Sequence, residues 1–224
     1  MIKKVLIANR GEIAVRIIRA CAEMGIRSVA IYTEPDRYAL HVKRADEAYS
    51  LGEDPLAGYL DPRRIVNMAL ETGCDSIHPG YGFLSENAEF ARLCEQQGIA
   101  FIGPDSGVIH KMGDKTQARD SMRAAGVPIT PGSEGNLADV DEALMMADEI
   151  GYPIMIKATS GGGGRGIRRC DTPQELKLQY PRVISEATKA FGSAEVFMEK
   201  CIVDPRIIEV KVLAERQGNG VHLY

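Results

Sequence analysis

The sequence lacks the features that mark several large classes of protein. No run of apolar residues approaches the ~20 that a membrane-spanning helix needs. The apolar run at the N-terminus is also too short for the ~7–15-residue core of a signal peptide. Net charge is only −4, so there is no general excess of basic residues for binding nucleic acid. These absences predict a cytoplasmic protein that binds neither membranes nor nucleic acids.

Cysteine and histidine are present, but not in the patterns that hold metals or disulfides. The cysteines are five, an odd number, and form no CxxC pair, which indicates reduced thiols. Each is more typical of a small buried apolar residue than of a nucleophile. The four histidines show neither an HExxH spacing nor a CxxC partner, which argues against a zinc site.

What is present is an alternation of strand-like and helix-like segments over the first hundred residues. The chain has 224 residues, 45% hydrophobic and 26% charged, enough for one or two globular domains. Strands are expected at 5–8, 29–32, 75–78 and 99–102, and helices after Asn9, at 61–72 and at 86–97. Such βα units predict a parallel sheet with helices on both faces. Asn9 is a candidate cap for the first helix, which Gly25 ends.

The second half has a different pattern. Helical segments follow residue 105, with an interruption at 112–115, and a proline- and glycine-rich linker at 126–132 is the best domain boundary. We expect a helix at 139–150, strands at 154–157 and 166–170, and a helix capped by Thr172 that Pro181 breaks or kinks. Further strands are expected at 195–202 and 207–214. The chain ends inside a strand, which suggests an N-terminal piece of a longer protein.

The most informative string is the glycine loop at 161–166, Gly-Gly-Gly-Gly-Arg-Gly, which follows Lys157. Adjacent glycines suit a loop whose backbone N–H groups approach a phosphate closely. A strand precedes and follows the loop, so it is not a dinucleotide-binding turn, and no GK[ST] follows, so it is not a P-loop. Lys157 before the loop, without HRD or DFG motifs, also differs from a protein kinase. A nucleotide flap and a flexible surface hairpin remain.

Three other places carry chemistry-bearing residues. Lys115 begins a helix, and 199–202 (Glu-Lys-Cys-Ile) ends a strand where donors and acceptors could read an adenine edge. The segment 78–87 follows a buried strand, at the end of a sheet where ligands bind. Each also has an ordinary structural interpretation: an exposed lysine, a charged sheet edge, and a tight Pro-Gly turn.

Together, these strings resemble the biotin carboxylase component of biotin-dependent carboxylases, in order and over essentially the whole chain. The strings are residues 7–14, 78–87, 101–104, 112–115, 124–128, and 156–158 with the glycine loop at 161–166. The resemblance implies an α/β fold: a Rossmann-like N-terminal domain at 1–103, connecting helices at 104–128, the lid subdomain of an ATP-grasp domain at 129–202, and the start of its central domain at 203–224.

The resemblance also implies a reaction. Members of the family use MgATP and bicarbonate to form carboxyphosphate, then carboxylate biotin on a carrier protein or domain. By similarity, Lys115 and Lys157 hold the ATP phosphates, Gly163 and Gly164 donate backbone N–H groups, and the Tyr81-Gly82 turn lies near the biotin pocket. The adenine is framed by residues at the end of one strand: Glu199, Lys200, Cys201 through its backbone, and Ile202.

Partners and departures follow from the same resemblance. A helix face with Arg16, Arg19 and Glu23 implies a homodimer, and a carboxyltransferase component is the further partner. Ile207 replaces a nucleotide-contacting histidine, and Lys211 stands where glutamine is common. The Mg²⁺-binding glutamates, the bicarbonate site and the catalytic arginine of the family lie beyond residue 224.

Catalytic residues and metal ligands are therefore expected outside this chain, which alone should be inactive. Two alternatives stay open. One is another ATP-grasp carbon–nitrogen ligase, of the carbamoyl-phosphate synthetase type. The other is a non-catalytic module for nucleotide binding or dimerisation.

Overall fold

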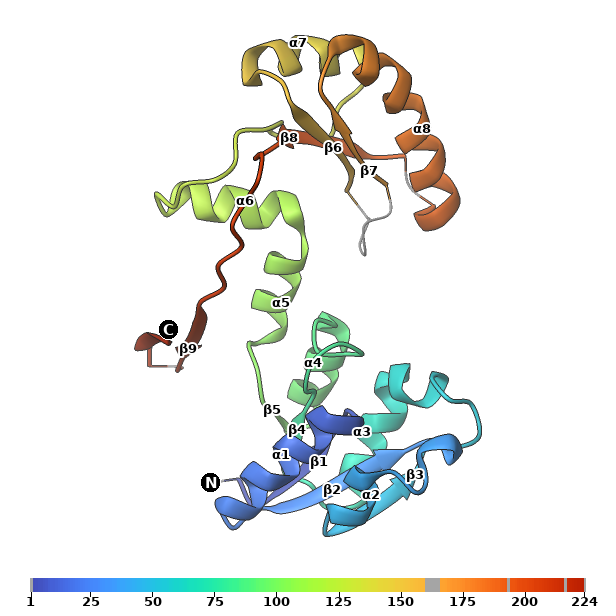
Figure 1. Ribbon diagram of the computed structural model, residues 1–224. Coiled ribbons are helices and arrows are strands. Elements are labelled where there is room, and N and C mark those ends of the chain that lie inside the picture. The colour runs from blue at the N-terminus through green and yellow to red at the C-terminus, as the bar shows by residue number, and fades with distance from the viewer. Residues whose placement is uncertain (1, 160–165, 193, 216, 224) are drawn as a thin grey trace. The chain divides into compact units, whose positions relative to one another are not determined.

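The computed structural model describes residues 2–159, 166–192, 194–215 and 217–223 (Figure 1). The chain forms two compact units, Met1–Ser121 and Met122–Tyr224. The division between them falls inside the 104–128 segment, where the sequence predicts connecting helices.

The first unit is built on a five-stranded parallel sheet. Its strands run in the order β3-β2-β1-β4-β5, and every neighbouring pair is parallel. The strands are β1 (Lys4–Ile7), β2 (Arg27–Tyr32), β3 (Glu47–Ser50), β4 (Ser76–His78) and β5 (Ala100–Phe101). The predicted parallel sheet is confirmed, and β3 is a strand that the sequence pattern did not indicate.

Helices connect these strands and extend beyond the last of them. They are α1 (Gly11–Glu23), η1 (Glu34–Asp36), α2 (Leu40–Arg44), η2 (Ala57–Leu60), α3 (Pro62–Glu71), α4 (Ala88–Gln96), α5 (Ser106–Gly113) and α6 (Lys115–Ala124). Asp61, Asn87 and Asp105 each accept a hydrogen bond from the backbone N–H three residues on, and so cap α3, α4 and α5.

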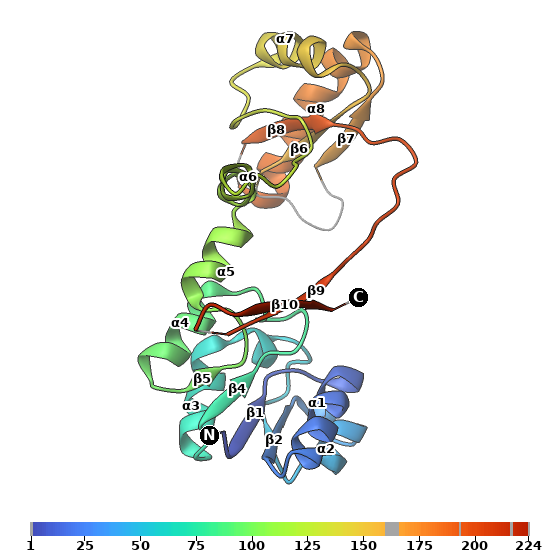
Figure 2. The same cartoon turned by 90° about the vertical axis from the view of Figure 1, so that its left-hand side faces the viewer.

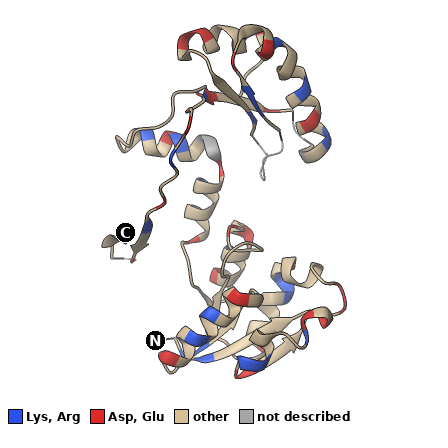
Figure 3. Cartoon of the chain, in the orientation of Figure 1, with Lys and Arg blue, Asp and Glu red and all other residues tan. Residues whose placement is uncertain are grey.

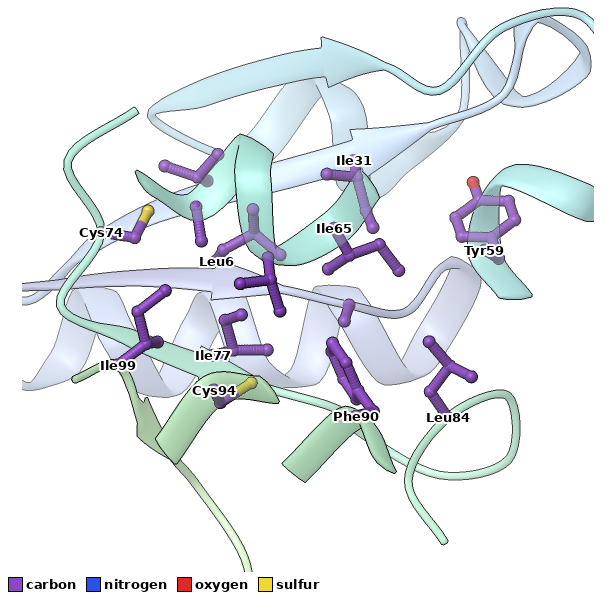
Figure 4. Packing of buried hydrophobic residues seen from close by; sticks show 14 of the residues in the cluster. Leu6, Ile31, Tyr59, Ile65, Cys74, Ile77, Leu84, Phe90, Cys94 and Ile99 are labelled. Atoms are coloured by element: carbon purple, nitrogen blue, oxygen red, sulfur yellow. The ribbon is translucent and has the colours of Figure 1, made fainter. Parts of the chain in front are cut away.

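Two apolar layers flank the sheet, because successive side chains of a strand point to opposite faces. On β1, Val5 and Ile7 pack in one cluster with Ile17 of α1. Leu6 belongs to the cluster on the other face, which α3 and α4 complete with residues such as Phe90 (Figure 4). Helices therefore cover both faces, as the repeated βα units predict.

The expected cap of α1 is wrong. Arg10, not Asn9, occupies the N-cap position, and its side chain makes no capping hydrogen bond. The Asn9 side chain is instead directed to a loop some seventy residues further along the chain, where it donates to the carbonyl oxygens of Pro79 and Tyr81.

The second unit contains a three-stranded antiparallel sheet in the order β7-β6-β8. Its elements are α7 (Val140–Ile150), β6 (Ile154–Ala158), β7 (Ile167–Cys170), α8 (Pro173–Phe191) and β8 (Val196–Lys200). Ile154, Ile156 and Met198 are fully buried in one cluster with side chains from α7 and α8, so both helices pack on the same face of the sheet.

The segment before α7 lies along the outer edge of β8. Ser133 N–H donates to the Met198 carbonyl at 2.9 Å, Leu137 N–H to the Val196 carbonyl at 2.8 Å, and Lys200 N–H to the Pro131 carbonyl at 2.7 Å. Beyond β8, β9 (Lys211–Ala214) and β10 (Gly220–Leu223) form an antiparallel hairpin (Figure 2).

Helix α8 begins as the sequence predicts but does not stop at its proline. The Thr172 hydroxyl accepts from Glu175 N–H at 3.2 Å, which confirms the cap. The helix continues through Pro181 to Phe191, so the proline does not end it.

Candidate functional site

One face of the β7-β6-β8 sheet is turned away from α7 and α8, and it carries the candidate phosphate-binding lysine. Since side chains alternate along β6, Met155 and Lys157 point away from the face that holds Ile154 and Ile156. The register places Phe197 and Ile167 opposite Lys157 on the neighbouring strands. This face, turned away from the two helices, therefore combines a positive charge with apolar side chains, of which Phe197 is buried.

Lys157 and Glu199 form an ion pair on this face. Glu199 lies opposite Met155, two residues from Lys157 along β6, and long side chains can bridge this diagonal spacing. The two side chains are only 25% and 18% exposed. The pair is therefore partly shielded from water, where a charge interacts more strongly than at a fully exposed position.

Lys200 directs its side chain to the opposite face of the sheet. Its ammonium donates to the carbonyl oxygens of Gly151 and Tyr152, each at 2.8 Å, at the C-terminal end of α7. A cation there is favourable, because the last carbonyls of a helix lack partners within it. The Lys200 ammonium thus stabilises the turn between α7 and β6.

The strand end that follows offers backbone groups. Cys201 N–H donates to the Pro153 carbonyl at 3.0 Å. Among the residues that the structure describes, Ile202 N–H has no hydrogen-bond partner, and the Ile202 side chain is 60% exposed. Of the N–H groups at 200–202, the one at Ile202 is therefore available to an external acceptor.

Three further candidates are placed only in part. Lys115 is the first residue of α6 and belongs to the first compact unit, and its side chain lies outside the described part of the chain. Gly163 and Gly164 also lie outside the described residues. Their predicted contacts with phosphate stay predictions.

In the first unit, Tyr81 and Gly82 lie in a tight turn at the carboxyl end of β4. Gly80, Gly82 and Phe83 all have positive φ values of 65°, 67° and 44°. The turn is held by hydrogen bonds from Asn9 Nδ2 and by the bond from Gly80 N–H to His78 Nδ1 at 3.1 Å. The Tyr81 side chain is 64% exposed, so a fixed backbone presents it outward.

An aromatic and charged cluster supports the far side of this turn. The rings of Tyr59 and Phe83 stack with centroids 5.2 Å apart, and the Arg10 guanidinium lies 5.4 and 5.6 Å from them. Asp36 accepts hydrogen bonds from both Arg10 and the Tyr59 hydroxyl. Burial opposes ionisation of Asp36, but these two bonds prevail and keep its pKa below the ordinary value.

Sequence reasoning missed this cluster, although Arg10 and Phe83 both lie in strings that it singled out. Tyr59 stands in a 3₁₀ turn and Asp36 at the end of another, and neither has a periodic pattern around it. Only the parallel topology, which brings the carboxyl ends of β1, β2 and β4 to one edge, could have suggested that they meet.

The helix face expected to form a dimer is exposed on α1. Arg19 and Glu23 form an ion pair at 2.9 Å, with side chains 73% and 62% exposed, and Arg16 is exposed beside them. Positive and negative residues are interspersed over both units (Figure 3). A pair this exposed contributes little to folding, so its residues remain available to a partner.

Other chemistry can be surveyed over the described residues. No group of three His, Cys, Asp or Glu side chains there could hold a metal ion. Four cysteines are buried, and burial raises the pKa of Cys94 to about 12 and that of Cys170 to about 11, which disfavours the reactive thiolate. Within the same residues, no helix has the length and hydropathy to cross a bilayer.

Comparisons with known proteins agree over the whole chain. Residues 1–109 match the model of the biotin carboxylase N-terminal domain, and residues 114–224 match the ATP-binding domain of the carbamoyl-phosphate synthase L chain. The small subunit of 2-oxoglutarate carboxylase from Hydrogenobacter thermophilus is 56% identical, with 100% of this chain and 47% of that protein covered. Biotin carboxylase 1 from Bacillus subtilis is 55% identical, with 100% and 50% covered.

A solved structure gives the same result in three dimensions. It is the biotin carboxylase domain dimer of the Hydrogenobacter thermophilus 2-oxoglutarate carboxylase, in complex with MgADP, ADP and bicarbonate. The TM-score is 0.92 at 56% identity, with 99% of this chain and 49% of that chain covered. The chain thus spans about half the length of these relatives.

A Rossmann-like domain followed by an ATP-grasp-type region places the chain in the ATP-grasp class. Within that class, the chain belongs to the biotin carboxylase family. The match of residues 1–109 to the biotin carboxylase N-terminal domain separates it from carbamoyl-phosphate synthetases, with which the family shares its ATP-binding domain.

Proposed function

We propose that this chain provides the nucleotide lid and part of the biotin site of an enzyme that carboxylates biotin with ATP and bicarbonate. A bicarbonate oxygen attacks the γ-phosphorus, ADP leaves, and carboxyphosphate forms. Its carboxyl group then passes to N1′ of biotin, and phosphate leaves with the proton that N1′ loses. The relatives named as biotin carboxylases, and the complex of one of them with MgADP and bicarbonate, support this reaction.

The observation that carries the proposal is Lys157 on the face of the β7-β6-β8 sheet that is turned away from α7 and α8, four residues before the glycine string. In this role Lys157 binds the ATP phosphates, helped by Lys115 and by the backbone N–H groups of Gly163 and Gly164. Phosphoryl transfer depends on positioning and on neutralising phosphate charge, which is what ammonium and N–H groups supply. Mg²⁺ would add its own charge at the phosphates when ATP is bound.

The adenine would lie against the end of β8. Ile202 N–H can donate to a ring nitrogen, and the backbone of Cys201 and the Glu199 side chain border the same position. Lys200 contributes through its backbone, because its ammonium is held by the Gly151 and Tyr152 carbonyls. This arrangement would recognise adenine mainly through hydrogen bonds to the edge of its ring.

Biotin would approach the Tyr81-Gly82 turn in the first unit. We further propose a cytoplasmic protein whose partners are a biotin carboxyl carrier protein or domain, a carboxyltransferase component, and a second copy bound through Arg16, Arg19 and Glu23. The dimer of the 2-oxoglutarate carboxylase domain supports the last of these.

Calorimetric titration with MgATP tests the nucleotide site. The Lys157→Gln variant should bind at least tenfold more weakly, because a hydrogen bond to a charged group contributes roughly 1.5–3 kcal/mol. Lys177→Gln is the matched control, since Lys177 is exposed on α8 in the same unit. Equal affinity of wild type and Lys157→Gln would contradict the assignment.

We also propose that the 224-residue chain binds nucleotide without turning it over. In the family, the Mg²⁺-binding glutamates, the bicarbonate site and the catalytic arginine lie further along the sequence, and this chain spans about half of its relatives. Release of phosphate from ATP that requires both bicarbonate and free biotin, measured on this chain, would refute the proposal.

A further inference from the structure

Asn9 is a buried polar residue whose hydrogen bonds all serve the turn that follows β4 or its own backbone neighbour. The residue is only 3% exposed. Its Nδ2 group donates to the Pro79 and Tyr81 carbonyls, each at 2.8 Å, and its Oδ1 accepts from Arg10 N–H at 3.0 Å. Both amide hydrogens are therefore committed to one loop, one on either side of Gly80.

The turn fits against Asn9 without spare room. A Cβ at Gly80 would lie 2.6 Å from Asn9 Nδ2 and 2.8 Å from the Ile13 side chain, distances that real Cβ atoms do not adopt. At Gly82 a Cβ would meet nothing within 4 Å. The close contact is thus confined to Gly80, where the Asn9 side chain bonds to the backbone on either side. The positive φ values at Gly82 and Phe83 determine the course of the turn beyond it.

The side chain carried by this turn is not itself buried. Tyr81 is 64% exposed. Its carbonyl accepts a hydrogen bond from Asn9, and the neighbouring Phe83 stacks on Tyr59. A loop whose backbone is tightly bonded and whose aromatic side chain faces outward is suited to contact a ligand with little loss of conformational freedom on binding.

We propose that Asn9 is a positioning residue that holds the Tyr81-Gly82 turn in the conformation that contacts biotin. This inference rests on the proposed function for the identity of the ligand. Asn9 does not touch biotin. It acts through two backbone carbonyls, and its amide is the group that can donate to both at once while it accepts from Arg10 N–H.

The decisive variant is Asn9→Asp, which keeps the size of the side chain but cannot donate. It also places a negative charge against two carbonyl oxygens. Asn67→Asp is the matched control, because Asn67 is exposed on α3 in the same unit and the substitution adds the same charge. Asn9→Ala removes the donors without adding charge, and keeps the test valid if the aspartate variant fails to fold.

Two measurements on the ¹⁵N-labelled chain follow the effect of the Asn9 substitutions on the turn. The first is amide exchange at Gly80 and Ser85, whose N–H groups bond to His78 Nδ1 and to the Gly82 carbonyl. The second is titration with free biotin, followed at the Tyr81 and Gly82 amides. In Asn9→Asp we expect exchange at both turn amides at least tenfold faster and biotin binding at least tenfold weaker, with β1 and β2 exchange and MgATP affinity unchanged.

The inference is overturned if exchange at Gly80 and Ser85 equals that of wild type, or if it rises while biotin affinity stays the same. A wild-type chain that binds MgATP but shows no response to biotin would instead refute the biotin part of the proposed function. In that case amide exchange at Gly80 and Ser85 alone decides the role of Asn9. Faster exchange in Asn9→Asp supports the conclusion that Asn9 holds the turn, and unchanged exchange refutes it.

Discussion

The Lys157 ammonium and the Glu199 carboxylate meet on the face of the sheet that α7 and α8 leave uncovered. Lys157 alternates with buried Ile156 and Ala158 on β6. Glu199 follows buried Met198 on β8, and the antiparallel register brings the pair within reach. The pair keeps a partly buried lysine neutralised when no phosphate is bound. Under the proposal that Lys157 binds the ATP phosphates, an incoming phosphate competes with Glu199 for the same ammonium group.

This competition predicts the effect of Glu199→Gln. Removal of the carboxylate frees the lysine and takes away a charge that repels phosphate, so affinity for inorganic tripolyphosphate should rise severalfold in calorimetry. Glu186→Gln is the matched control, because Glu186 also pairs with a cation, Arg168, but on α8. A fall in tripolyphosphate affinity would show that Glu199 supports the phosphate site rather than competing with it.

The two glycines of the turn after β4 should differ when each is changed to alanine. Both have a φ near +66°, so both substitutions carry the strain of a left-handed conformation, of order 1 kcal/mol. Only Gly80→Ala adds a clash with Asn9, which should raise its total cost to roughly 2–4 kcal/mol. Urea unfolding of the two variants measures the difference, and equal destabilisation would contradict the tight contact.

Stability of the first unit should fall as the pH drops below about 6.5. Burial lowers the pKa of His78, and likewise that of fully buried His41. Below the ordinary histidine pKa the unfolded chain takes up protons that the folded chain excludes, so stability decreases by up to about 1.4 kcal/mol per pH unit per histidine. Protonated His78 also loses the acceptor for Gly80 N–H.

Urea unfolding between pH 7.5 and 5.5, followed at β1 and β2 amides, checks this dependence. The His78→Gln variant should show a shallower slope than wild type, whereas His110→Gln, at an exposed position on α5, should not. A stability that rises on acidification would mean that burial does not control these two imidazoles.

Charge reversal on α1 tests the proposed dimer. Arg19→Glu replaces the exposed Arg19–Glu23 pair by two like charges, which should shift the chain to monomer in sedimentation velocity while its melting temperature changes little. Arg92→Glu disrupts a similar exposed pair with Glu89 on α4 and should leave the oligomeric state unchanged. An Arg19→Glu chain that remains dimeric would place the interface elsewhere.

The sequence predicts most of the regular elements, because their apolar periodicity coincides with burial. The strands around Val5 and Val29 and the helices from Pro62 and Ala88 all lie where the pattern places them. The edge strand β3 has no apolar run: Glu47 within it is held by ion pairs with Lys4 and Arg27. Its place depends on partners distant in sequence, which periodicity cannot reveal.

The sequence predicts which residues belong to the candidate site, but not how their side chains are arranged. Lys157 and the end of β8 could be singled out as residues, but their pairing depends on the β6-β8 register. The direction of Lys200 likewise depends on the end of α7. Asn9 shows the limit most clearly: locally it is a good helix cap, yet its two long-range hydrogen bonds to the turn prevail.

Because residues 131–137 form hydrogen bonds with β8, that strand is not a free edge of its sheet. With β6 on one side and this segment on the other, β8 is bonded along both edges, as a strand inside a sheet is. Its N–H and C=O groups are thereby withdrawn from pairing with another chain, a common route to aggregation. On the opposite border, β7 exposes Arg169, a charge that discourages such pairing. A sheet of only three strands is in this way protected at both of its borders.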